Sequence, residues 1–222
     1  SLIRYGQWTV LEIVLAMLQD TEAVRPDLSP DHRQEVAALL NALGRPEHIK
    51  LIEHHLNKAP HPRTEALLTL LLSMKREIVP ALCSLLANLD APAHQSIIVE
   101  ALATVARENA DPVVRGLSDK RPAYVRHLLN LIGKWNDSRM ADSVEKTLRH
   151  PDTQVRKDAL KLLAHLRPSG TGVKMVALLN DPDETVRLTA MKLLSSGHYT
   201  APFTCWSPFI TAEEFHERSS SE

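Results

Sequence analysis

Eleven histidines make a metal site the first chemistry to consider, and the richest cluster lies in the stretch PEHIKLIEHHL. His48 and His55 are seven residues apart, which places them on one face of a helix, and Glu47 or His54 could complete a set of two or three ligands. The adjacent His54 and His55, however, point about 100° apart around a helix, so both cannot bind one ion without distortion. We interpret the stretch as a polar helix surface and predict no metal and no other cofactor.

The sequence gives no clear sign of a catalytic nucleophile or of a phosphate-binding loop either. Cys83 lies in the apolar run VPALCSLLANL, where a small buried core residue is expected and no activating cation is identifiable. The segment PSGTGVK, residues 168–174, lacks the preceding strand and the glycine spacing of a P-loop, and we interpret it as a turn between repeats. Because no Ser-His-Asp arrangement is recognisable either, we predict that the protein is not an enzyme.

Composition narrows the choice of partner and compartment. The net charge of −1 divides into −3 for residues 1–110 and +2 for residues 111–222, too little to demand nucleic acid or an anionic membrane. Two distant cysteines, Cys83 and Cys205, form no disulfide framework and fit a reducing, cytoplasmic compartment. The longest apolar run, WTVLEIVLAMLQ, is too short to span a bilayer and contains a glutamate. Abundant Leu and Ala with 4% aromatic residues favour helices.

The elements that must position any site come from an internal repeat. The stretch RHPDTQVRKDALKLLAHL, residues 149–166, is followed by the near copy NDPDETVRLTAMKLLSSG, residues 180–197, and KRPAYVRHLLNLIGKW lies upstream of both. Alignment on the Val-Arg pairs, extended by the apolar pattern, gives six anchors: His32, Pro62, Ile97, Val125, Val155 and Val186. Neighbouring anchors lie about 30 residues apart, which is typical of a solenoid whose stacked helical pairs bury one another's apolar faces.

Each unit has room for two helices, so we predict an all-α fold. The expected helices lie near residues 8–19, 30–43, 46–57, 62–75, 77–88, 93–108, 111–118, 121–135, 138–149, 151–166, 171–179 and 182–196, with Pro151 in the first turn of its helix. We divide the chain into an N-terminal capping helix within residues 1–28, a repeat array over 29–197, and a C-terminal segment, 198–222. That last segment carries the aromatic stretch HYTAPFTCWSPFI, which either caps the array or joins it to a further repeat, and a helix expected from about Thr211.

The pattern Asp-Pro-acidic-x-x-Val-Arg followed by Ala-x-x-Leu-Leu resembles the HEAT and HEAT-like (PBS lyase-type) repeat family, clearly in residues 119–197 and by register alone in residues 30–118. The resemblance implies a right-handed α-α superhelix of about six helical pairs, with second helices lining a concave face. Residues 124–163 are also similar to large bacterial proteins in which HEAT-like arrays accompany signalling modules. In those proteins the array usually continues past an F-x-x-R-S-x-x-E segment such as FHERSSSE here, so we expect a piece of a longer protein.

The same resemblance argues against one enzymatic activity. HEAT-like di-iron hydroxylases carry a His-Glu pair just after the Val-Arg position, where this chain has His127-Leu128, Lys157-Asp158 and Leu188-Thr189. A phycobilin-lyase-like enzyme and a nucleic-acid-binding HEAT-like protein remain as alternatives. The second alternative would need a strongly basic concave face, which the charge balance does not favour.

Recurrent arginines are the most regular charged feature of the chain. Arg126, Arg156 and Arg187 resemble the internal ladder of HEAT arrays, in which arginines pair with acidic groups of neighbouring units. Asp152 and Asp183, each four residues before an arginine, are the expected partners. We predict that these five residues hold the repeats together and do not contact a partner protein.

A second set of residues is predicted to form a partner-binding stripe. If second helices line the concave face, positions two, six and ten residues after each anchoring valine share one side. The predicted partner-binding residues are His127, Trp135, Lys157, Lys161, His165 and Lys192 on this stripe, with Lys134 alongside it. Residues 119–192 carry 14 Lys and Arg against 9 Asp and Glu, so the stripe is expected to be mildly basic with one exposed tryptophan. A solvated lysine-rich face without a partner is the alternative.

Together these patterns favour a non-enzymatic scaffold for protein–protein interaction within a larger bacterial signalling or regulatory protein. The expected partner is a protein or peptide, with an acidic segment as the favoured chemistry. Neither a membrane nor nucleic acid is expected as a partner.

Overall fold

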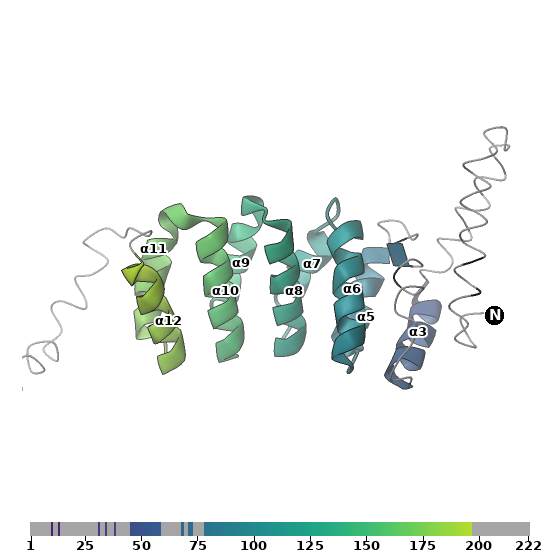
Figure 1. Ribbon diagram of the computed structural model, residues 1–222, viewed down its shortest axis with the longest axis horizontal. Coiled ribbons are helices and arrows are strands. Elements are labelled where there is room, and N and C mark those ends of the chain that lie inside the picture. The colour runs from purple at the N-terminus through teal and green to yellow at the C-terminus, as the bar shows by residue number, and fades with distance from the viewer. Residues whose placement is uncertain are drawn as a thin grey trace, which may run out of the picture. The chain divides into compact units, whose positions relative to one another are not determined.

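The described part of the chain is entirely helical. The computed structural model describes residues 45–58 and 78–196, together with Val10, Ile13, Asp31, Gln34, Ala38, Leu68, Leu71 and Leu72. Residues 45–58 and 78–196 contain nine complete α-helices, two short 3₁₀ helices and no strand (Figure 1), and the isolated positions are helical too, which confirms the all-α prediction for the described residues. The helices expected near residues 8–19, 30–43 and 62–75 have only those isolated positions described, and segment 198–222 lies wholly outside the described residues.

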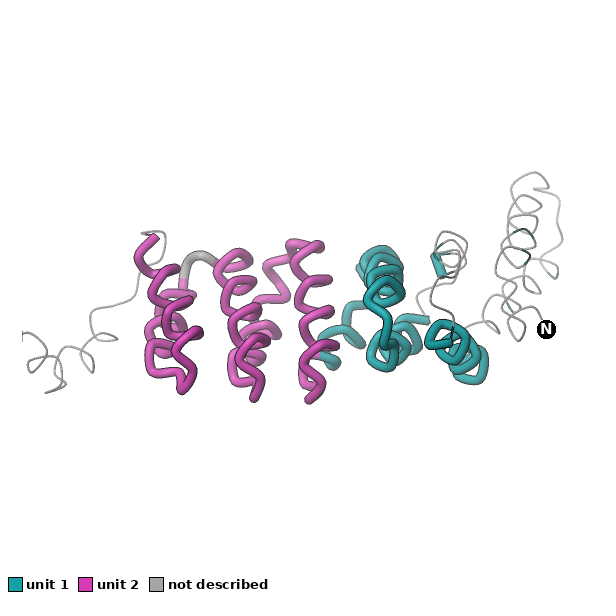
Figure 2. Tube along the Cα trace, turned by 60° about the horizontal axis from the view of Figure 1, so that its bottom comes forward, with its two compact units in different colours: residues 1–116 teal, residues 117–222 magenta. Residues whose placement is uncertain are grey.

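The chain divides into two compact units, residues 1–116 and residues 117–222 (Figure 2), a division that the sequence did not predict. The first unit contains α3 (Pro46–Lys58), α5 (Val79–Asn88), α6 (Pro92–Val105) and α7 (Asp111–Gly116). Helix α5 packs against each of the other three, and its apolar side chains form the core of this unit. Cys83 of α5 is buried, as expected from its apolar surroundings in the sequence.

The second unit is a two-layered stack of helices. It contains α8 (Pro122–Trp135), η3 (Ser138–Met140), α9 (Ala141–Thr147), α10 (Thr153–Leu166), α11 (Pro168–Ala177), η4 (Leu178–Asn180) and α12 (Glu184–Ser195). Helix α10 is central, because it packs against α8, α9, α11 and α12. Figure 1 shows α8, α10 and α12 side by side in one layer, with α9 and α11 behind them. The second helices of three repeats therefore form one layer.

Two local predictions about prolines are wrong. Pro151 precedes the N-cap residue Asp152 and so lies outside α10, because the Asp152 carboxylate accepts the N–H of Val155 and fixes the start of the helix. The segment PSGTGVK is not a turn but the start of α11, with Pro168 in the first helical turn, where its missing N–H costs nothing. Gly170 has a φ of +96°, a conformation that glycine adopts readily.

The three second helices follow one another at a constant repeat interval. They begin at residues 122, 153 and 184, and the difference between neighbouring start positions is the same. The loops before them carry Asp119, His150 and Asp181, and each of these side chains accepts the backbone N–H two residues further on, at 2.8, 3.0 and 2.9 Å. Because both the loops and the helix starts keep this repeat interval, residues that stand one interval apart are structurally equivalent in this unit.

The repeat interval corrects the alignment on Val-Arg pairs by one residue at α8. Val125 is equivalent to Arg156, not to Val155, and both side chains are buried. The sequence carries the signal for this shift, since Pro122 stands three residues before its valine whereas Pro151 stands four before Val155. A shift of one residue rotates a side chain by about 100° around a helix, so it changes which residues face the core.

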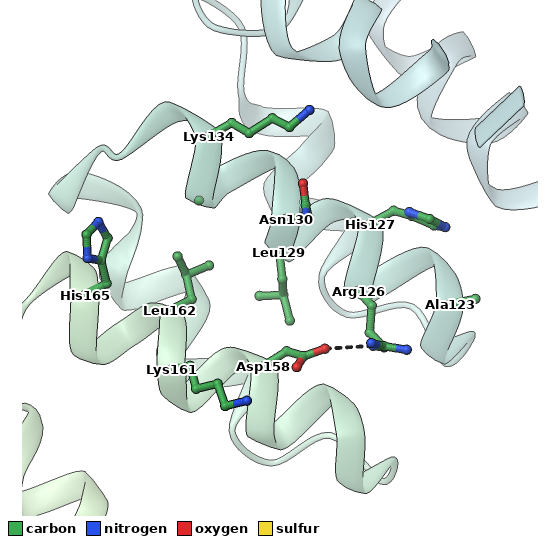
Figure 3. Close-up of a pocket in the computed structure, with 11 residues that line it drawn as sticks. Ala123, Arg126, His127, Leu129, Asn130, Lys134, Asp158, Lys161, Leu162 and His165 are labelled. Atoms are coloured by element: carbon green, nitrogen blue, oxygen red, sulfur yellow. Dashed lines mark hydrogen bonds and ion pairs between the residues drawn. The ribbon is translucent and has the colours of Figure 1, made fainter. Parts of the chain in front are cut away.

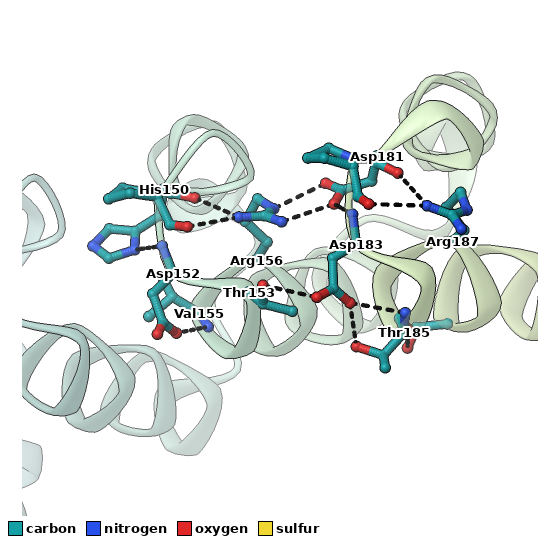
Figure 4. Close-up of polar contacts among 12 residues, drawn as sticks. His150, Asp152, Thr153, Val155, Arg156, Asp181, Asp183, Thr185 and Arg187 are labelled. Atoms are coloured by element: carbon teal, nitrogen blue, oxygen red, sulfur yellow. Dashed lines mark hydrogen bonds and ion pairs between the residues drawn. The ribbon is translucent and has the colours of Figure 1, made fainter.

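Arg156 joins the repeats that contain α10 and α12 through a buried ion pair with Asp181 (Figure 4). Its Nε and Nη2 groups donate to the two carboxylate oxygens at 2.9 and 2.7 Å. Its Nη1 group donates to the backbone carbonyls of His150 and Pro151, so the same guanidinium also holds the preceding loop. The side chains are 10% and 4% exposed. Burial by itself raises the pKa of Asp181, but the hydrogen bonds from Arg156 and from a backbone N–H outweigh it and hold that pKa below its usual value.

The predicted acidic partners of the arginines are therefore wrong. Asp152 and Asp183 are N-cap residues whose carboxylates turn toward the N–H groups of their own helices. Asp183 also accepts the hydroxyl of Thr153 at 3.2 Å, which adds a second polar link between α10 and α12. The carboxylate that Arg156 uses lies in the loop, two residues before the predicted Asp183.

Arg126 and Arg187 also differ from the predicted ladder. Arg126 lies one position beyond the equivalent of Arg156 and pairs instead with Asp158, as described below. Arg187 repeats the loop contacts of Arg156, since its Nη1 group donates to the carbonyls of Asp181 and Pro182 at 2.9 and 3.1 Å. Its Nε and Nη2 groups meet no acceptor among the described residues.

Between the loops before α8 and α10, His150 takes the place that the Arg156–Asp181 ion pair has at the next joint. His150 Nδ1 accepts the Asp152 N–H, so the proton of the neutral ring lies on Nε2, which is 3.2 Å from the carbonyl oxygen of Asp119 and donates to it. Neighbouring loops are thus linked at both joints, once by a histidine and once by an arginine.

We predict that Arg156→Ala lowers the free energy of unfolding by about 3 kcal/mol or more, because it leaves the Asp181 carboxylate buried without its counter-charge. Arg187→Ala is the matched control, since it removes equivalent loop hydrogen bonds and no ion pair. Its cost is expected to stay below about 1.5 kcal/mol. Urea unfolding followed by circular dichroism measures both, and equal losses would contradict the role of the ion pair.

Stability is also expected to fall in acid. Hydrogen bonds from Arg121 lower the pKa of Asp119 to about 2, and the pKa of Asp181 is lowered as described above. Below pH 4 the unfolded chain therefore binds more protons at these sites than the folded chain does, so their contribution is complete above about pH 5 and is lost as the pH falls. Urea titrations at pH 7 and pH 3 measure this loss. Asp181→Asn should show a smaller difference between the two pH values than the unmodified chain.

Candidate functional site

An open groove of about 880 Å³ runs between α8 and α10 in the second unit (Figure 3). It is lined by Ala123, Arg126, His127, Leu129, Asn130, Gly133, Lys134, Asp158, Lys161, Leu162 and His165. Arg126, Asn130 and Lys134 are spaced four residues apart, so they form one exposed row along α8. Lys161 and His165 continue the corresponding row on α10.

Gly133 is the one glycine among the residues that line the groove. A methyl group added to this residue would lie 3.5 Å from Leu162 Cδ1, an ordinary contact distance. The glycine is therefore not required by the packing of α8 on α10. It lines the groove at a position where any other residue would place a side chain.

The single carboxylate of the groove is already neutralised by the protein. Asp158 Oδ2 accepts from Arg126 Nε at 2.7 Å, and Oδ1 accepts from Gln154 Nε2 at 2.8 Å. The ion pair engages only the Nε of Arg126, so its two terminal nitrogens have no acceptor among the described residues, and the side chain is 49% exposed. A carboxylate or phosphate could approach this guanidinium without displacing Asp158.

Two lysines supply the other positive charges of the groove. The ammonium groups of Lys134 and Lys161 are exposed and have no partner within the described ranges. Burial and, second, the charge of Arg126 lower the pKa of His127, so its ring is neutral at pH 7 and can serve only as a hydrogen-bonding group. Three cations and one paired carboxylate thus line the groove, so its lining carries a net positive charge.

The structure brings together part of the predicted stripe. His127, Lys134, Lys161 and His165 all line the groove. Lys157 is half-buried on α10, and Lys192 is exposed on α12, but neither contributes to this lining.

The prediction that Trp135 is exposed is wrong, because the residue is only 7% exposed. The repeat interval explains the error, since Trp135 is equivalent to the buried Leu166 and therefore faces the core. The same shift hid Arg126 and Asn130, which are the true equivalents of Lys157 and Lys161. Asp158 was also missed, because its significance comes from its contact with Arg126, which is distant in the sequence.

A second concave surface lies in the first unit, between α3 and α5. It has a volume of about 810 Å³, and its polar contacts link the two helices: Asn57 Nδ2 donates to the Asn88 carbonyl, and Asn88 Nδ2 donates to Glu53. His54 lines it as well, but the rings of His54 and His55 stand at 75° with centroids 6.0 Å apart. The described residues contain no group of three or more His, Cys, Asp or Glu side chains placed to bind one metal ion.

Comparison with known proteins assigns no family to the chain. No protein-family model matches it, and no curated protein does. Among the described residues, no helix combines the length and the apolar character needed to cross a membrane. The described part of the chain is therefore an all-helical protein with an electropositive groove between the neighbouring helices α8 and α10.

Proposed function

We propose that this chain is a non-enzymatic protein-interaction module, and that the groove between α8 and α10 binds an acidic segment of a partner protein. The observation that carries the proposal is the charge of the groove. Arg126, Lys134 and Lys161 line it with charge that Asp158 compensates only in part, and Asp158 is held by groups of the protein itself.

Each side chain has a distinct role in this proposal. The terminal nitrogens of Arg126 form a planar pair of donors that suits bidentate contact with one carboxylate. Lys134 and Lys161 act as point charges further along the groove, and neutral His127 contributes a hydrogen bond. Because these groups are largely exposed, they should govern orientation and association rate more than they add affinity.

The proposal assumes a larger architecture of HEAT-like type, a right-handed superhelix of about six helical pairs. The constant repeat interval of α8, α10 and α12, with equivalent loop contacts at each interval, supports that assumption. We further propose that the module belongs to a larger cytoplasmic signalling or regulatory protein of bacteria, on the basis of the resemblance described above. It acts there as a scaffold and not as an enzyme.

The proposal predicts that a fluorescein-labelled peptide of ten residues rich in Glu and Asp binds the chain saturably, whereas a Lys-rich peptide of equal length does not. The variant Lys134→Glu/Lys161→Glu should weaken binding at least tenfold, because it reverses the charge of the groove. Fluorescence anisotropy at 50 and 150 mM salt measures the affinity, which should fall as salt rises.

Lys146→Glu/Lys120→Glu is the matched control, since it changes the net charge equally at two exposed lysines outside the groove. Equal weakening by both double variants would show attraction to net charge only and would contradict a binding groove. Binding to a 20-base-pair DNA duplex that exceeds binding to the acidic peptide would instead favour the nucleic-acid alternative.

A further inference from the structure

Helix α12 carries two residues, Arg187 and Met191, whose repeat equivalents in α10 are buried. Met191 is 56% exposed, whereas its equivalent Leu160 is 0% exposed and stands one helical turn after Arg156, the residue that reaches Asp181 in the next repeat. Arg187 is likewise equivalent to Arg156, which is buried at the joint between α10 and α12. The last described repeat therefore presents the kind of surface that in α10 forms a joint.

Arg187 shows which chemistry this surface lacks. Both arginines use Nη1 to bind the two carbonyls of their own preceding loop. Arg156 directs Nε and Nη2 to a carboxylate from the following repeat, whereas the same nitrogens of Arg187 meet no acceptor among the described residues. The unfilled position is therefore one for an Asp or Glu side chain.

Apolar groups adjoin this position. Leu188 is 43% exposed, and with Met191 it extends the surface next to the arginine. In the joint that serves as a template, Asp181 stands three residues before the first residue of α12, and α12 then packs on α10. A fitting partner consequently combines a carboxylate shortly before a helix with an apolar helix face.

We propose that Arg187, Leu188 and Met191 form an interaction surface for a helix of a partner protein that carries an Asp or Glu just before its first turn. The partner carboxylate binds the Nε and Nη2 groups of Arg187, and the apolar face of its helix covers Met191. This surface is distinct from the groove between α8 and α10 and does not depend on the function proposed for that groove.

The chain supplies its own probe for this surface, because residues 180–196 already make the equivalent joint with α10. A labelled peptide NDPDETVRLTAMKLLSS, stapled between the positions of Leu188 and Lys192, whose side chains are exposed in α12, would be helical enough to test. Added to the full chain, it should bind saturably with a dissociation constant below about 1 mM.

Two matched comparisons make the result specific. Arg187→Ala in the chain, or Asp→Asn at the peptide position of Asp181, should each weaken binding at least tenfold. Lys192→Ala on the same helix, and Lys134→Glu/Lys161→Glu in the groove, should change it less than twofold. Absence of saturable binding, or equal binding to the Arg187→Ala variant, would overturn the proposed surface and would leave the test of the groove unaffected.

Discussion

The guanidinium of Arg156 must find hydrogen-bond acceptors at a place that water hardly reaches, and this requirement ties three parts of the second unit together. Its donors bind the loop before its own helix and the carboxylate in the loop before the next one. Such a pair adds less to stability than its Coulomb energy suggests, because both groups lose their hydration. Its main effect is geometric, since only one relative position of α10 and α12 satisfies both partners.

The fixed spacing of the repeats also determines which side chains of α8 and α10 line the groove. Because the loops are linked at a constant repeat interval, the row that contains Arg126, Asn130 and Lys134 must stand beside the row that contains Lys161 and His165. In α8 the position equivalent to the buried Arg156 is occupied by Val125. The arginine of α8, Arg126, therefore comes one residue later, is exposed and pairs with Asp158. The packing of the repeats and the charge of the groove are therefore two consequences of one register.

Much of this could be read from the sequence. Apolar periodicity predicted the bounds of α3, α8 and α12 to within two residues, because burial of one helix face dominates the choice of local structure. The error at α8 arose because identical Val-Arg pairs suggested an equivalence that the loop hydrogen bonds contradict, and it misplaced Trp135 and hid Arg126. The choice of Asp181 over Asp183 could not be predicted, since both are acidic residues near the helix start and only the geometry shows which one caps the helix.

The most direct test of this account measures the energetic coupling between Arg156 and its acidic neighbours. Double-mutant cycles with Arg156→Ala and either Asp181→Ala or Asp183→Ala, each followed by urea unfolding, give the two coupling energies. We predict a coupling of about 2 kcal/mol or more with Asp181 and below about 0.5 kcal/mol with Asp183. A larger coupling with Asp183, or none with either residue, would contradict the claim that the Arg156–Asp181 pair sets the register of the repeats.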